Sequence, residues 1–147
     1  MARKQTPPPD RWTCPACGRE FRRTGQSHSC DPLMTLDERL ALLDSNQRAI
    51  CEALLARLPE IGDVQVEPVR VGLFLKHGSV FASLRMRRAG MRLLFMLPRP
   101  LEHPRLSYPR VRRGTTRIPH STTLVGPKDV DDVAMSWLAE SYARSDG

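Results

Sequence analysis

Apolar residues recur at helical spacing over the first part of the chain. Leucines stand three or four residues apart from position 36 to 43, and a second apolar series runs from position 50 to 58. A period of 3.6 residues places such positions on one face of a helix. Between the two series, Asp44-Ser45-Asn46 has the residue types of a helix stop followed by a new N-cap. We therefore predict helices over 35–43 and 46–58, the second ended by Pro59 and Gly62.

The period of the apolar residues changes to two after Asp63. Over 64–75 the pattern predicts a single extended segment, in which Pro68 indicates an edge strand or a bulge because proline has no N–H to donate. One face of this segment is expected to hold Val69, Val71, Leu73 and Leu75. The alternation continues over 79–87 and 91–97, with turns at 76–78 and 88–90, and this predicts an antiparallel meander.

The last third of the chain contains a loop, a strand and a helix. Four prolines and the lack of a period predict a long loop over 98–114, and alternation resumes over 115–125. Over 125–143, Pro127 fits a first helical turn, and three following aspartates complement the positive end of a helix dipole. The expected apolar stripe of this helix is Val130, Val133, Trp137 and Leu138.

These elements predict an α+β fold. We expect an antiparallel sheet of about four to five strands, flanked by N-terminal and C-terminal helices, with a small zinc knuckle or ribbon in front of it. Residues 1–11 contain three consecutive prolines and are predicted to be a flexible arm. The zinc-binding segment is predicted over 12–32 and the α+β domain over 33–147.

The zinc prediction rests on a cluster of cysteine and histidine residues. Cys14 and Cys17 are separated by two residues, and His28 and Cys30 follow ten residues later, which gives the pattern C-x2-C-x10-H-x-C. Two close pairs of such ligands are typical of a four-coordinate zinc site, and a site closed by four protein ligands is structural. The spacing is too short for a helix that presents ligands one turn apart, so a knuckle or ribbon is favoured over a ββα finger. We expect one structural Zn²⁺ ion.

Other interpretations of the cysteines are less favourable. A redox pair at Cys14 and Cys17 calls for a preceding strand, and iron generally calls for four cysteines. Because no signal region or membrane span is evident in the sequence, we expect a cytoplasmic protein, in which thiols stay reduced and clustered cysteines favour metal. Cys51 lies on the apolar side of its predicted helix and is expected in the core.

The positive charge of the chain is concentrated in its middle. The net charge is +7, and residues 64–126 contain twelve basic and two acidic residues, a net charge of +10. Such a tract favours an anionic partner, most commonly DNA or RNA, and arginine bonds phosphates through a planar fork. Ordinary solvated strand exteriors are the competing interpretation. The arginines proposed to contact nucleic acid are Arg19, Arg22, Arg23, Arg85, Arg87, Arg112, Arg113 and Arg117.

The assembled parts resemble the bacterial domain-of-unknown-function family 5655. The resemblance rests on WTCPACGREFRRTGQSHSC at the front and on LEHPRL, RIPHSTTL and DVDDVAMSWLAESYA in the back half, and it extends from Trp12 to Tyr142. It implies a small α+β domain distantly like the YdhG-type fold, preceded by a zinc-finger segment. It implies no established activity.

No catalytic set is evident in the sequence, so we expect a protein that is not an enzyme. His120, beside a basic loop, is the one histidine outside the zinc site with a candidate role, either in a pocket or as a buried, hydrogen-bonded core residue. Three functions remain open. The first is a zinc-containing nucleic-acid-binding protein, the second is a protein- or small-ligand-binding module, and the third is an enzyme that uses His120 on a phosphate ester.

Overall fold

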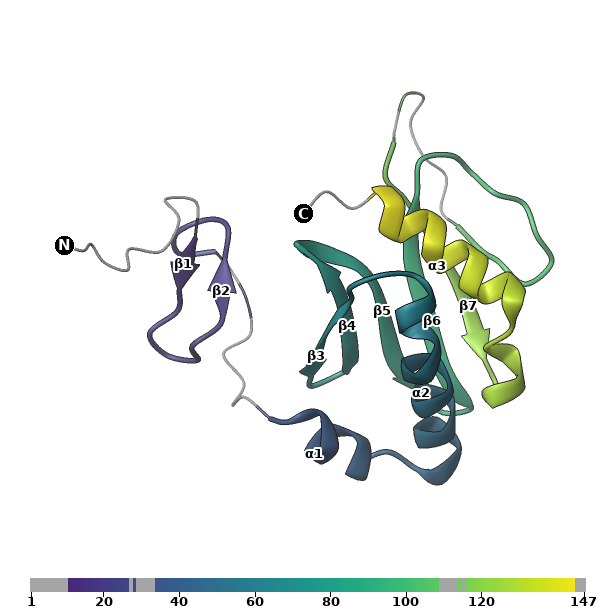
Figure 1. Ribbon diagram of the computed structural model, residues 1–147, viewed down its shortest axis with the longest axis horizontal. Coiled ribbons are helices and arrows are strands. Elements are labelled where there is room, and N and C mark those ends of the chain that lie inside the picture. Colours follow the sequence, from purple (N-terminus) through teal and green to yellow (C-terminus); the bar gives the residue numbers. More distant parts are fainter. Residues whose placement is uncertain (1–10, 27, 29–33, 109–113, 115, 145–147) are drawn as a thin grey trace. The chain divides into compact units, whose positions relative to one another are not determined.

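The computed structural model describes residues 11–26, 28, 34–108, 114 and 116–144. The chain divides into two units, Met1–Met34 and Thr35–Gly147. Each unit has its own secondary structure, drawn in Figure 1 from the purple N-terminal strands to the yellow C-terminal helix. The predicted α+β class is confirmed, because the second unit combines helices with one antiparallel sheet of five strands.

The first unit contains a short hairpin. Strand β1 (Trp12–Thr13) pairs antiparallel with β2 (Glu20–Phe21), and Trp12 stands opposite Phe21. The turn between the strands passes through Gly18, whose φ of +77° lies in the left-handed region that glycine enters without a steric penalty.

Two helices open the second unit, close to their predicted positions. Helix α1 (Leu36–Ala41) and helix α2 (Ser45–Arg57) each begin with a capping box. The N-cap of α2 is Asp44, the first residue of the Asp44-Ser45-Asn46 stretch in which the sequence indicated a cap. Its side chain accepts a hydrogen bond from the Gln47 N–H, and the Gln47 side chain accepts one from the Asp44 N–H. A short 3₁₀ turn, η1 (Leu58–Glu60), follows.

The sheet runs in sequence order β3-β4-β5-β6-β7, and each strand is antiparallel to its neighbours. Its strands are β3 (Gln65–Val69), β4 (Gly72–His77), β5 (Ser79–Arg87), β6 (Gly90–Leu97) and β7 (Ile118–Leu124). β3 lies at one edge, which accommodates Pro68 as expected.

The single extended segment predicted over 64–75 is wrong. The chain reverses at Arg70 and Val71, so that β3 and β4 form a hairpin. Val71 is exposed in the turn and does not share a face with Leu73 and Leu75. Gly72 has a φ of +154°, and a Cβ there would collide with the carbonyl oxygen of Leu84 on β5. The predicted turn at 76–78 is also shorter, since β4 continues to His77.

The C-terminal helix starts later than the sequence indicated. Pro127–Asp129 forms a separate 3₁₀ turn, η2, and helix α3 covers Asp132–Arg144. Val133 was expected in the apolar stripe of this helix, but it is 42% exposed and does not belong to the buried face. The buried face of α3 consists instead of Ala134, Met135, Trp137, Leu138 and Ser141.

The sheet has two different faces. In Figure 1, α2 and α3 lie over the same face of the sheet, which we call the core face. Its side chains alternate along each strand and join those of α2 and α3 in one core; examples are Leu84 and Leu93 of the sheet, with Leu54 and Leu138 of the helices.

The intervening side chains point to the opposite side, which we call the outer face. Two cross-strand rows define it: Phe74, Ser83 and Leu94 in one, and Gly72, Arg85 and Arg92 in the next. Phe74 and Leu94 are half-buried and do not belong to the core cluster.

No helix within the described ranges has both the length and the apolar character needed to cross a bilayer.

Candidate functional site

Three potential metal ligands converge in the N-terminal hairpin. The Sγ atoms of Cys14 and Cys17 and a ring nitrogen of His28 all lie within 4.8 Å of one another. Both cysteines are buried, and His28 is partly buried. Cys30, the predicted fourth ligand, lies outside the described residues.

The backbone between the two cysteines forms a tight knuckle. The Cys14 N–H donates to the Arg19 carbonyl at 2.9 Å, and the Gly18 N–H donates to the Cys14 carbonyl at 2.8 Å. The Arg19 backbone N–H also bonds the Cys17 thiol. Backbone donors of this kind stabilise a thiolate, which is the form of cysteine that binds metal.

The orientation of the His28 ring is set by its second nitrogen. Nδ1 lies 2.6 Å from the carbonyl oxygen of Gln26. Since a carbonyl oxygen only accepts hydrogen bonds, Nδ1 carries the proton and Nε2 is the nitrogen that faces Cys17 Sγ, at 3.3 Å. A carbonyl acceptor on the non-ligating nitrogen is the usual outer partner of a metal-bound histidine.

Aromatic rings pack around this histidine. The Phe21 ring centroid lies 4.2 Å from that of His28, and the Trp12 centroid lies 6.0 Å from it. These rings form an apolar environment around His28, in a unit that has few other large apolar side chains.

The pKa values of the cluster favour a charged pair. Burial works against the Cys17 thiolate, but hydrogen bonds from Arg19 and His28 more than offset it and lower the pKa of the thiol. The pKa of His28 is raised, first because the ring donates to the Gln26 carbonyl, an effect that partial burial opposes. An imidazole held beside thiols in this way exchanges its proton for a metal ion when one is present.

Two thiols and an imidazole are a ligand set that can hold a metal ion. With Zn–S bonds of about 2.3 Å and Zn–N bonds of about 2.0–2.1 Å, neighbouring ligand atoms of a tetrahedron are about 3.5–3.8 Å apart. The Cys17 Sγ and His28 Nε2 atoms are 3.3 Å apart, and all three ligand atoms lie within 4.8 Å of one another, close to these separations. The cluster is thus positioned to hold a metal ion.

The predicted arginines are divided between the two units of the chain. Arg19, Arg22 and Arg23 belong to the first unit, whereas Arg85, Arg87 and Arg117 belong to the second. Arg112 and Arg113 lie outside the described residues.

Several other arginines of the second unit are held by carboxylates. The ion pairs are Arg48–Glu52 at 3.0 Å, Arg57–Asp132 at 2.7 Å, Arg99–Glu140 at 2.9 Å and Arg105–Asp131 at 2.9 Å. Arg105 also lies over the Trp137 ring, 5.3 Å from its centroid. These four arginines therefore have structural partners.

The arginines of β5 and β6 differ from that group. Within the described ranges, no ion pair joins Arg85, Arg87 or Arg92 to a carboxylate. Arg85 and Arg92 stand directly opposite each other across the two strands. A like-charge pair in that position is unfavourable unless an anion lies nearby. Arg92 donates to the Ser121 hydroxyl on β7 at 3.2 Å.

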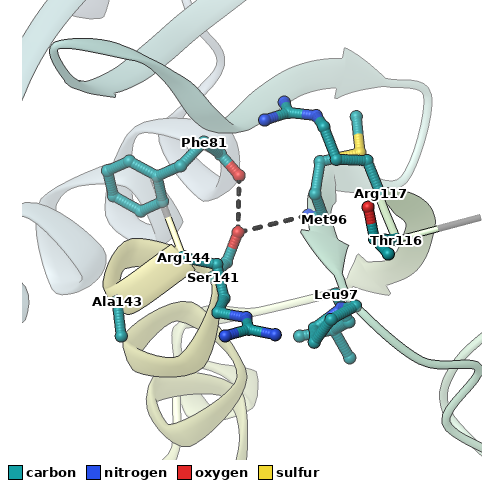
Figure 2. A pocket seen from close by; sticks show the side chains of 9 residues that line it. Phe81, Met96, Leu97, Thr116, Arg117, Ser141, Ala143 and Arg144 are labelled. Atoms are coloured by element: carbon teal, nitrogen blue, oxygen red, sulfur yellow. Dashed lines mark hydrogen bonds between the residues drawn. The ribbon is translucent and has the colours of Figure 1, made fainter. Parts of the chain in front are cut away.

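Arg117 lies elsewhere, at a cavity of about 380 Å³. Figure 2 shows Arg117 and Arg144 at this cavity, the first from the segment before β7 and the second from α3. Its inner wall includes Ser141, whose hydroxyl donates to the Phe81 carbonyl at 2.8 Å and accepts from the Met96 N–H at 3.2 Å. This hydroxyl joins β5 to β6 just beyond their last paired residues, Ala82 and Phe95.

His120 is a core residue with both ring nitrogens bonded. It is 1% exposed, its Nε2 accepts from the Leu101 N–H at 3.0 Å, and its Nδ1 lies 2.9 Å from the Ile118 carbonyl. Nδ1 therefore holds the proton, and the ring fastens the loop after β6 to β7. It does not line the cavity of Figure 2.

Three residues of these sites were not singled out from the sequence. Gln26 orients His28 through its backbone carbonyl. Because any residue at position 26 has a backbone carbonyl, the sequence does not reveal this role. Phe74 could have been found, because its alternation with Leu73 and Leu75 places it on the outer face. Ser141 has no signal, since its role depends on where β5 and β6 separate.

Comparison with known proteins places most of the second unit in one family. No curated protein and no solved structure matched the chain. A family model described as Domain of unknown function (DUF5655) matches residues 40–145, which is well over half of the sequence. The chain therefore belongs to the DUF5655 family.

Proposed function

We propose that this protein is a non-enzymatic nucleic-acid-binding protein of the cytoplasm that carries one structural zinc ion. Cys14, Cys17 and His28 supply three ligands, and Cys30, two residues after His28, supplies the fourth. Four protein ligands leave no position for a reacting water, so the ion stabilises the hairpin and takes part in no reaction.

The observation that supports nucleic-acid binding is the distribution of ion pairs. Arg48, Arg57, Arg99 and Arg105 bond carboxylates, whereas the arginines of β5 and β6 have no such partner within the described ranges. Charges that only improve solubility are commonly interspersed with opposite charges. A group of arginines without carboxylates is suited to phosphates, which accept two parallel hydrogen bonds from a guanidinium.

The experiment is a titration of zinc-loaded, full-length protein against labelled single- and double-stranded DNA and RNA, at 50 mM and 200 mM salt. Binding to phosphates releases counterions, so we expect affinity to fall steeply between these concentrations. Absence of binding to all four nucleic acids at the lower salt concentration overturns the nucleic-acid proposal. Zinc content, measured on the same preparation by atomic emission, tests the metal proposal independently.

A further inference from the structure

We infer that the outer face of the sheet binds single-stranded nucleic acid, with a base on Phe74 and phosphates on Arg85 and Arg92. This inference rests on the proposed function and specifies its surface and its ligand.

The outer face is apolar in the middle and basic at one end. Phe74 on β4 and Leu94 on β6 flank the small side chain of Ser83 on β5 in one cross-strand row. The next row consists of Arg85, two residues after Ser83 on β5, and Arg92, two residues before Leu94 on β6. Arg87 continues on the same face of β5, since side chains alternate along a strand.

Acidic groups are almost absent from the strands. Glu67 is the one carboxylate in β3–β7. It stands opposite Phe74 at the edge of the outer face, and it bonds Lys76 at 3.1 Å. The strands hold four basic residues, Lys76, Arg85, Arg87 and Arg92. The positive charge of this face favours an anionic ligand. Its apolar side chains favour an anion that also has flat, apolar parts.

A nucleotide with an unstacked base has both properties. Phe74 and Arg85 are diagonal neighbours on adjacent strands, so their backbones are about 7–8 Å apart. A base can therefore stack on the half-buried Phe74 ring while its phosphate reaches a guanidinium. Sheet faces with aromatic side chains and flanking cations bind single strands in this way.

Duplex nucleic acid fits the face less well. Its bases are stacked inside, so a duplex would present only phosphates and groove edges to Phe74 and Leu94. The apolar row would then gain no stacked base. The face consequently favours a single strand over a duplex of the same sequence.

The test compares charge-matched variants of the full-length, zinc-loaded protein, with a fluorescein-labelled 20-nucleotide single strand and its duplex as probes. Arg85→Gln and Arg92→Gln are each expected to weaken single-strand binding about tenfold, and each is expected to reduce the salt slope by about 0.7. Phe74→Leu keeps an apolar side chain of similar size. It is expected to weaken binding by at least about fivefold without changing the salt slope, because stacking involves no counterions.

Arg48→Gln is the matched control. Arg48 is an exposed arginine of α2 that is already paired with Glu52, and its replacement makes the same change in net charge. We expect its affinity to stay within twofold of the parent. Circular dichroism and the urea midpoint of each variant confirm that it is folded.

The outcomes separate this inference from the proposed function. Salt-dependent binding that Arg85→Gln, Arg92→Gln and Phe74→Leu leave unchanged overturns the outer face as the site, although the protein still binds nucleic acid. Tighter binding of the duplex overturns the single-strand preference. No binding by the parent protein overturns both the inference and the proposed function.

Discussion

The Sγ atom of Cys17 lies 3.3 Å from Nε2 of His28, although the two residues are eleven positions apart in the sequence. The Gln26 carbonyl fixes which nitrogen faces the sulfur, and Phe21 packs on the imidazole ring. A histidine nitrogen and two thiols thus lie close enough together to hold one metal ion.

Replacement of one ligand is expected to abolish stoichiometric zinc binding. Cys17→Ser removes a thiolate that lies within 4.8 Å of the other two ligand atoms. Zinc content should fall from about one ion per chain to well below half, measured by atomic emission after dialysis. Cys51→Ala is the control, because Cys51 is buried in the core of the other unit. Unchanged zinc content in Cys17→Ser would contradict the assignment.

The Cys51 thiol is expected to resist modification in the folded protein. It is fully buried, and desolvation raises its pKa to about 11, an effect that the nearby charge of Arg39 only partly opposes. At pH 8 almost no thiolate is present to react. Iodoacetamide labelling followed by peptide mass spectrometry should find Cys51 unmodified until urea unfolds the protein. Rapid labelling of Cys51 in buffer alone would show that the core is open there.

Loss of the Ser141 hydroxyl is expected to destabilise the main unit. Ser141→Ala leaves the Phe81 carbonyl and the Met96 N–H without the bond that each makes to this hydroxyl. Leaving buried backbone groups unsatisfied costs about 1–3 kcal/mol, measured as the change in the free energy of urea unfolding. Ser136→Ala is the control on the same helix, because the Ser136 hydroxyl is exposed and bonds the Val133 carbonyl of its own helix. Equal stability of the two variants would contradict a bridging role.

The Asp131 carboxylate is expected to stabilise the fold in a pH-dependent way. It caps α3 by accepting from the Ala134 N–H at 2.9 Å, and it pairs with Arg105 at 2.9 Å. Partial burial opposes its ionisation, but these bonds outweigh that effect and lower its pKa. A lowered pKa in the folded state means that the stabilisation is complete above the unfolded pKa of about 3.9 and is lost as the pH falls through the folded value.

The measurement is the difference in unfolding free energy between the parent and Asp131→Asn. We expect about 1 kcal/mol at pH 7, from the partly exposed pair with Arg105 and from the negative charge at the start of α3, because asparagine can still cap the helix. The difference should shrink below about pH 4. Asp63→Asn is a control of the same chemistry, because the Asp63 carboxylate makes no ion pair in the described part of the chain. A difference for Asp131→Asn that stays constant from pH 7 to pH 3 would rule out the charge as its cause.

Local signals in the sequence predict most elements of the fold. The helices over 36–41 and 45–57 follow directly from leucine spacing and from the Asp44 cap. The hairpin at Arg70 and Val71 was missed, because alternation continues through it without a glycine in the turn itself. Gly72, one residue later, marks the close approach of β4 to the Leu84 carbonyl, which depends on a third strand that local patterns do not reveal.

The candidate sites differ in how far the sequence predicts them. The ligands of the metal centre lie close together in the sequence. Their spacing alone therefore predicted that Cys14, Cys17 and His28 form one cluster. The basic surface depends on which arginines find carboxylates, and partners such as Glu140 for Arg99 or Asp131 for Arg105 come from distant segments. Composition therefore showed the charge of the chain but not which arginines remain available to a ligand.

The most direct measurement for nucleic-acid binding is the slope of log affinity against log salt concentration for the parent protein and a single-stranded oligonucleotide. Two phosphate contacts, from Arg85 and Arg92, predict a slope of about −1.4. A slope near zero, or no binding at 50 mM salt, would contradict a function in which these arginines hold phosphates.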